Sequence, residues 1–196
     1  KGSHPFYHGK IAKSIVQKVS SIKDNPGLLT LQDFANYRVK ERTATCAPYK
    51  QYEICGMGPP SSGALTVGQI MGISSHFDLK TLGKDNPKSW QIIGDASRLA
   101  FADRGRYMAD TDFVPMPKGL LDPMYLKQRA DLISTGKVLE SVSAGEPTWE
   151  KSVALADDIS LELPSTTHFV IVDKQGKMVS MTSTIENGFG SRVMSN

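Results

Sequence analysis

The residues best suited to chemistry are two adjacent threonines, Thr166 and Thr167, at the start of a strand-like run of β-branched residues. A threonine hydroxyl is a weak nucleophile at neutral pH and needs a base within hydrogen-bonding reach. Its own α-amino group can serve, with a pKa of about 8, but that amine exists only once the preceding peptide bond has been cut. By themselves, two threonines before a strand more often reflect β-propensity than catalysis.

The chain around these threonines predicts a β-hairpin. Residues 166–173 form one strand, residues 174–177 a turn and residues 178–185 a second strand, which returns Thr184 alongside Thr166. His168 on the first strand is expected to be packed or hydrogen-bonded. The preceding residues, 134–164, show no periodicity and predict an exposed, flexible connection in which a backbone cut would be tolerated.

Five helices are predicted in the remaining chain, and these helices would have to support the hairpin. A capping-box sequence begins at Thr30, and Asp103 with Arg104 is expected to form an ion pair or a helix-end contact. A second hairpin is predicted over residues 37–57, with its turn at residues 48–51. The predicted helices cover residues 5–22, 30–37, 64–73, about 90–104 and 121–133.

Cys46 and Cys55 lie symmetrically about the turn of the residue 37–57 hairpin, so they could face each other on paired strands. The geometry of a cross-strand disulfide is demanding, and a free cysteine is commonly a buried apolar side chain. We therefore favour two buried free thiols, with a disulfide as the alternative. In either case two cysteines are too few for a four-cysteine zinc site.

Other polar groups are expected to have structural roles. His4 and His8 have the spacing of two metal ligands on a helix, but Pro5 lies between them and no third ligand is apparent. Asp110 and Asp112 are expected to cap a turn, because the spacing of a calcium-binding loop is absent.

Composition limits the class of protein. The 196 residues are 39% apolar and 22% charged, which is typical of a soluble globular protein. A net charge of +3 is too small to indicate a nucleic-acid or membrane-surface binder, and no apolar run reaches the roughly 20 residues of a membrane span. The chain begins within a helical pattern and ends after two strands, which alone are marginal in water, so we expect a piece of a longer protein.

Five segments, in order along the chain, resemble landmarks of the γ-glutamyltranspeptidase family. That family consists of N-terminal-nucleophile hydrolases, which are made as precursors and cleave themselves into a large and a small subunit. The resemblance implies an α+β chain that is part of an αββα sandwich, to which it contributes outer helices and one core hairpin. The segments are residues 6–9 with the helix that follows, 31–37, 58–63, 101–104 with 110–113, and 166–169 with 172–173.

The same resemblance implies a division of the chain and a set of site residues. Residues 1–165 would be the C-terminal portion of the large subunit, with the flexible connection at about 134–165, and residues 166–196 would open the small subunit. Thr166 would be the nucleophile, freed by autocatalytic cleavage of the Ser165–Thr166 bond, and Thr184 would hydrogen-bond and orient it. Glu186 matches a position that contacts the α-amino group of the substrate. Many members have Asn there, and a carboxylate would make a stronger, charge-assisted hydrogen bond.

The implied reaction is hydrolysis or transfer of the γ-glutamyl group of glutathione and related compounds, through a threonyl ester that water or an amino acid resolves. No metal or organic cofactor is implied. The expected partners are small-molecule substrates and the other subunit of the processed heterodimer, in the bacterial periplasm or outside the cell. The oxyanion hole of the family would lie beyond Asn196, and its loss costs roughly 3 kcal/mol or more, so the chain alone is expected to be inactive.

Two alternatives remain open. A cephalosporin or glutaryl acylase on the same scaffold would keep the threonine and change the acyl pocket, most of which would lie outside this chain. A non-catalytic homologue that never matures would serve as a binding or structural protein. The presence of Thr166, Thr184 and a polar residue at position 186 argues against the second alternative.

Overall fold

The computed structural model describes residues 2–149, 154–156, 166–185 and 187–195. They fall into two compact units, one formed by the parts of the chain up to residue 40 and after residue 159, the other by residues 41–159. Helices and strands occur in both units, which confirms the predicted α+β class. Within the described residues, no helix has both the length and the apolar character required to cross a membrane.

The first unit contains the expected N-terminal helix as two pieces. Residues 5–22 were predicted as a single helix, but the chain breaks at Gly9, which caps the second piece with extended backbone. A Cβ atom at Gly9 would lie 2.7 Å from the Cα of Pro5, so the two pieces approach too closely there for a side chain. The helices of this unit are α1 (His4–Tyr7), α2 (Lys10–Ser20) and α3 (Leu31–Asn36).

The start of α3 confirms the capping box. The Thr30 hydroxyl accepts from the backbone N–H of Asp33, and the Asp33 carboxylate accepts from the backbone N–H of Thr30. The Thr30 hydroxyl also donates to the Asp33 carboxylate, and this hydrogen bond, together with the one from the Thr30 backbone N–H, lowers the pKa of the Asp33 carboxyl. Backbone N–H groups at the start of a helix have no carbonyl acceptor within the helix, because no turn precedes them. The capping box satisfies two of these donors in α3.

The first unit also contains an antiparallel ribbon of two strands, β3 (Thr166–Val172) and β4 (Met178–Thr184), as predicted. The register pairs Thr166 with Thr184 at the open end and Val172 with Met178 beside the turn. Asp173 fixes that turn, because its carboxylate accepts from the backbone N–H groups of Gln175 and Lys177. The side chains of both strands are exposed on both faces.

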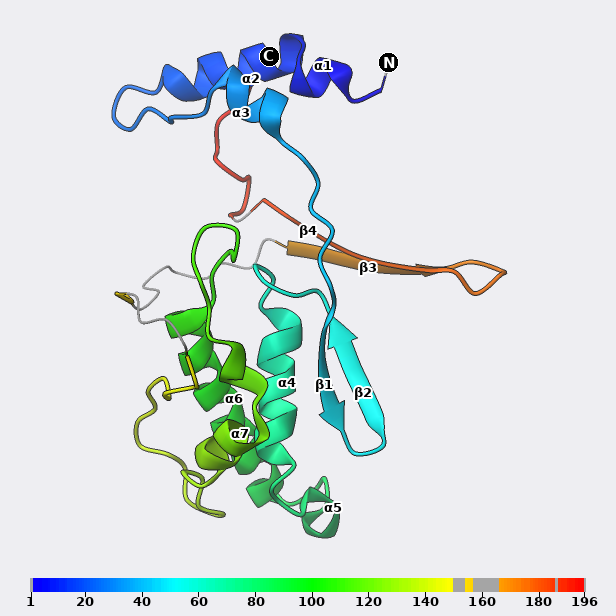
Figure 1. Cartoon of the computed structure of the whole chain (residues 1–196), viewed down its shortest axis with the longest axis vertical. Helices are drawn as coiled ribbons and strands as arrows, with labels where there is room; N and C mark the ends of the chain where they lie inside the picture. The colour runs from blue at the N-terminus through cyan, green and yellow to red at the C-terminus, as the bar shows by residue number, and fades with distance from the viewer. Residues whose placement is uncertain (1, 150–153, 157–165, 186, 196) are drawn as a thin grey trace. The chain divides into compact units, whose positions relative to one another are not determined.

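The second unit is built around α4 (Gly63–Ser74), which Figure 1 shows between the β1–β2 hairpin and α6. This position explains why α4 carries no charged residue. Ile73 of α4 packs in a core with buried side chains from α6 and α7, including Ile92, Leu99 and Leu126. The elements are β1 (Thr45–Tyr49), β2 (Tyr52–Gly56), α4, α5 (Leu79–Leu82), α6 (Pro87–Tyr107), the 3-10 helix η1 (Lys118–Leu121) and α7 (Pro123–Ala130).

The β1–β2 hairpin carries a disulfide between Cys46 and Cys55, so the expectation of two free thiols is wrong. The two cysteines are directly paired across the strands, with their Cα atoms 4.1 Å apart. Such close Cα atoms are typical of antiparallel pairs that do not exchange hydrogen bonds, where side chains approach most closely. The symmetric placement of the two cysteines about the turn was therefore a better guide than the demanding geometry of a cross-strand disulfide.

Changing both Cys46 and Cys55 to serine is expected to lower the stability of the hairpin by about 2–3 kcal/mol, because the cross-link closes a short loop in the unfolded chain. The midpoint of thermal unfolding measured on the full-length protein should fall accordingly. A thiol reductant should produce the same fall in the unsubstituted protein and none in the double variant. If the reductant leaves both proteins unchanged, the two thiols are not joined.

The segment that follows α7 is irregular, as predicted, but between residues 139 and 149 it is only partly exposed. Leu139 and Val142 pack against the apolar core, and Pro147 is buried. The expectation of exposure holds only for part of this stretch, because polar side chains of α6 and α7 supply hydrogen bonds to its backbone. Of the later part of the predicted connection, residues 154–156 alone lie within the described residues.

Candidate active site

The open end of the β3–β4 ribbon brings two of the predicted site residues together. The hydroxyl of Thr166 donates to the hydroxyl oxygen of Thr184, and the two oxygens are 3.0 Å apart. The side chains meet because directly opposed residues of an antiparallel pair lie on the same face. The contact gives the Thr166 hydroxyl a defined direction, while the roles of the two threonines in a reaction stay predictions.

A row of polar side chains continues along the same face. His168 is hydrogen-bonded at both ring nitrogens, with Nδ1 2.8 Å from the hydroxyl of Thr182 and Nε2 3.2 Å from that of Ser180. The expectation of a hydrogen-bonded histidine is confirmed. The two partners were missed in the sequence, although their alternation with Thr184 along one strand was the available signal.

Thr167 lies on the opposite face of the ribbon, because successive residues of a strand alternate, and it pairs with Ser183. The pair of adjacent threonines in the sequence is thus divided between two faces. The remaining predicted site residues, Ser165 and Glu186, lie outside the described residues.

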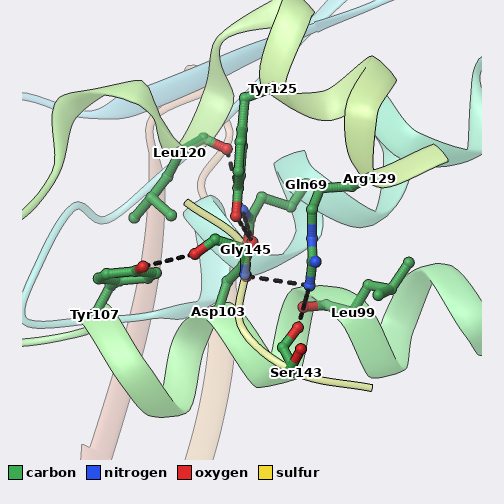
Figure 2. A network of polar contacts seen from close by, with 9 residues as sticks. All are labelled: Gln69, Leu99, Asp103, Tyr107, Leu120, Tyr125, Arg129, Ser143 and Gly145. Carbon is green, nitrogen blue, oxygen red and sulfur yellow. Dashed lines mark hydrogen bonds and ion pairs between the residues drawn. The ribbon is translucent and has the colours of Figure 1, made fainter. Parts of the chain in front are cut away.

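A second polar cluster lies inside the second unit, residues 41–159, which we call the helical unit. It surrounds the buried carboxylate of Asp103 (Figure 2). The side chain of Asp103 accepts hydrogen bonds from the Gln69 amide at 2.9 Å and the Tyr125 hydroxyl at 2.7 Å, and it forms an ion pair with Arg129 at 3.2 Å. The predicted structural ion pair of Asp103 therefore exists, but its partner is Arg129 rather than Arg104. Adjacent residues of a helix point in different directions, and Arg104 donates to the hydroxyl of Ser62 instead.

Two tyrosines border this carboxylate and remain proton donors. Burial and the negative charge of Asp103 raise the pKa of both Tyr107 and Tyr125. Tyr125 is affected more strongly, because it also donates its proton directly to Asp103. The Asp103 carboxylate is buried and surrounded by donors from Gln69, Tyr125 and Arg129, which suits the cluster to holding structure rather than to chemistry.

The other polar candidates occupy structural positions. The backbone N–H of Asp112 donates to the Asp110 carboxylate, as expected of a capped turn, and both carboxylates form ion pairs with Arg42 at 3.2 and 2.9 Å. In the part of the chain that the structure describes, one group of potential metal ligands brings Glu53 beside Cys46 and Cys55. Both sulfurs are already joined in the disulfide and offer no thiolate.

A family model described as Gamma-glutamyltranspeptidase matches residues 1–196. The chain belongs to the γ-glutamyltranspeptidase family. It is 35% identical over 201 residues to the "Glutathione hydrolase proenzyme" of Bacillus subtilis (strain 168), covering 99% of this chain and 34% of that protein. This chain therefore spans about a third of the length of the curated γ-glutamyltranspeptidase relatives that it matches.

The structure of Helicobacter pylori gamma-glutamyltranspeptidase is also similar, with 36% identity and a TM-score of 0.65 over 74% of this chain and 41% of that chain. A relative with another name is the "Acylase ACY 1 proenzyme" of Pseudomonas sp. (strain SE83). It is 31% identical over 194 residues, which cover 98% of this chain and 32% of the acylase. The predicted family is confirmed, and the relatives of this chain include proteins named for two different reactions.

Proposed function

We propose that the protein containing this chain is a γ-glutamyltransferase and glutathione hydrolase that matures by cutting itself before Thr166. The observation that carries the proposal is the hydrogen bond between Thr166 and Thr184 at the open end of the ribbon, in a chain of this family. The relatives named as glutathione hydrolase proenzymes support both the reaction and the maturation.

The maturation step uses the Thr166 hydroxyl. In the uncut chain the nitrogen of Thr166 belongs to an amide and is not a base. The hydroxyl oxygen attacks the carbonyl carbon of Ser165, the carbon–nitrogen bond breaks, and the nitrogen takes up a proton to become an amine. Water then hydrolyses the resulting ester, which leaves a carboxylate on Ser165 and restores the threonine hydroxyl with its new α-amino group.

Turnover then uses both groups of the same residue. The α-amine of Thr166 takes the proton of the hydroxyl, whose oxygen attacks the γ-carbonyl carbon of the substrate. The amide bond to the leaving group breaks, the departing nitrogen receives a proton, and a γ-glutamyl ester of Thr166 remains. Water or the amino group of an acceptor resolves the ester. Thr184 orients the hydroxyl, and Glu186 accepts a charge-assisted hydrogen bond from the α-ammonium group of the substrate.

The proposed maturation divides the chain into two polypeptides. Residues 1–165 would end the large subunit and residues 166–196 would begin the small subunit, the two remaining associated as a heterodimer. The Cys46–Cys55 disulfide supports a periplasmic or secreted location, because disulfides persist in oxidising compartments.

A second candidate is an acylase that acts on glutaryl or cephalosporin substrates through the same threonine. The relative named Acylase ACY 1 proenzyme, at 31% identity, favours keeping this candidate. The two reactions share the nucleophile and its activation and differ in the group that the acyl pocket accepts.

The full-length protein tests these proposals in two steps. Mass spectrometry should find a new amino terminus at Thr166, and the mature protein should release the anilide from a γ-glutamyl anilide faster than from a glutaryl anilide. Faster release from the glutaryl compound would favour the acylase. A full-length protein that stays uncut and inactive on both compounds would overturn the proposal and identify a non-catalytic homologue.

A further inference from the structure

The Cys46–Cys55 disulfide lies on the face of the β1–β2 hairpin that points away from α4. Side chains alternate along a strand, so the two cysteines share one face while their neighbours Ala47 and Ile54 share the other. Ala47 is buried, and a Cβ atom at Gly68 of α4 would lie 2.9 Å from its Cβ. Within the helical unit, α4 therefore covers the Ala47 face of the hairpin and leaves the disulfide face uncovered.

The two sulfurs of the disulfide differ in access. Cys55 is exposed, whereas Cys46 is half-buried. An external thiol opens a disulfide by attacking one of its two sulfurs, and the rate depends on how accessible that sulfur is. Access therefore favours attack at Cys55, with Cys46 as the leaving group.

The carboxylate of Glu53 lies beside the more exposed sulfur. Its Oε2 atom is 3.7 Å from the Sγ of Cys55, because residues two positions apart on a strand share a face. Among the described residues, Glu53 forms no ion pair, so its charge is open to a ligand. This charge attracts an ammonium group on an incoming thiol and repels an anionic thiol.

We propose that Cys55 is a modification site for small aminothiols, which are thiols with an ammonium group two carbons from the sulfur. The thiolate of the aminothiol attacks the Sγ of Cys55 and forms a new sulfur–sulfur bond. The bond to Cys46 breaks, its electron pair stays on the Sγ of Cys46, and a proton from water converts that sulfur to a thiol. The attacking sulfur is thus oxidised and the sulfur of Cys46 is reduced, while the ammonium group pairs with Glu53.

The position of the ammonium group decides the preference for aminothiols. When the aminothiol sulfur is bonded to Cys55, an ammonium group two carbons away can reach the Glu53 oxygen that lies 3.7 Å from the Cys55 sulfur. A thiol with a hydroxyl group in the same place gains no charge-assisted hydrogen bond with the carboxylate. The site formed by Cys55 and Glu53 therefore selects for charge as well as for a thiol.

The proposed function would supply such a thiol, and this part of the inference rests on it. In glutathione, the nitrogen two carbons from the sulfur belongs to the γ-glutamyl amide and carries no charge. Hydrolysis or transfer of the γ-glutamyl group frees this nitrogen as an ammonium group. The site at Cys55 and Glu53 would therefore take the product of the reaction in preference to its substrate.

The test compares cysteamine with mercaptoethanol, which have the same length and differ in carrying an ammonium or a hydroxyl group. Full-length protein is treated with each thiol, quenched with a maleimide and mapped by mass spectrometry. The adduct is expected on Cys55 and the maleimide on Cys46. In Glu53→Gln, the ratio of cysteamine adduct to mercaptoethanol adduct should fall about fivefold, the factor that one charge pair about 4 Å apart contributes in water.

The matched control is Glu140→Gln, which removes the same charge from the loop after α7, where the carboxylate pairs with Lys137. This variant should leave the adduct ratio unchanged. No adduct on Cys55, an adduct mainly on Cys46, or an equal ratio in Glu53→Gln and Glu140→Gln would each overturn the inference, whatever the activity of the protein.

A second experiment uses glutathione and separates this inference from the proposed function. Mature protein given glutathione should carry the thiol without its γ-glutamyl group on Cys55, whereas the Thr166→Ala protein should carry only intact glutathione. Mature protein that releases glutamate but carries only glutathione on Cys55 would contradict the preference for the product. If no glutamate is released, the proposed function fails, and the comparison of cysteamine with mercaptoethanol still decides the inference.

Discussion

Changing Thr166 to alanine in the full-length protein is expected to leave a single uncut polypeptide with no measurable γ-glutamyl transfer. The substitution removes the attacking oxygen of both the maturation step and the turnover step. Loss of a nucleophile lowers the rate by at least about 10⁴-fold in well-studied hydrolases. Intact mass measures the cut, and release of anilide from a γ-glutamyl anilide measures the turnover.

Thr167→Ala is the matched control, because this neighbour has the same side chain and lies on the opposite face of the ribbon. It should still mature and turn over substrate. Thr184→Val keeps the shape of the hydrogen-bonding partner and removes its hydroxyl, and it should slow maturation by about tenfold. A Thr166→Ala protein that still splits at this bond would overturn the assignment of the nucleophile.

Changing Asp103 to alanine is expected to destabilise the helical unit by about 3–5 kcal/mol, because it leaves the charge of Arg129 buried without its partner. The donors of Gln69 and Tyr125 also lose their acceptor. Hydrogen exchange of the α6 amides in the full-length protein measures this loss, since slow amides in a buried helix report the opening free energy of its unit.

The control for Asp103 is Asp131→Ala, which breaks an exposed ion pair with Lys127 on α7. Exposed pairs of this kind contribute about 0–1 kcal/mol, so α6 exchange should barely change. Equal effects of the two substitutions would show that the cluster around Asp103 does not stabilise the unit. Adding Arg129→Met to Asp103→Ala should restore part of the loss, because it removes the unpaired charge.

The sequence predicted those features that depend on neighbours along the chain. The capping box at Thr30 needs residues three positions apart, and the ribbon needs alternating β-branched residues on either side of a turn. The meeting of Thr166 with Thr184 follows from the length of that hairpin. The break at Gly9 was missed because it results from a close approach to Pro5 rather than from a strong helix-stop signal.

The sequence did not predict the polar cluster around Asp103, because its members come from separate elements. Gln69, Asp103, Tyr125 and Gly145 meet only after three helices have packed. One signal was available: Gln69 shares a helix face with Leu65 and Ile73, and Asp103 with Leu99, and a buried polar side chain must find partners. The irregular pattern of residues 134–149 was correctly interpreted as loop, but lack of periodicity says nothing about which loop residues are buried.

The β3–β4 ribbon has a practical consequence. Apolar side chains such as Phe169, Ile171 and Val179 are at least a third exposed, and within the described residues each strand pairs only with the other. Two unpaired strand edges beside exposed apolar side chains form a template to which strands of further copies of the chain can add. Production of this polypeptide without the rest of its protein should therefore yield fibrous aggregates, unless other strands cap both edges first.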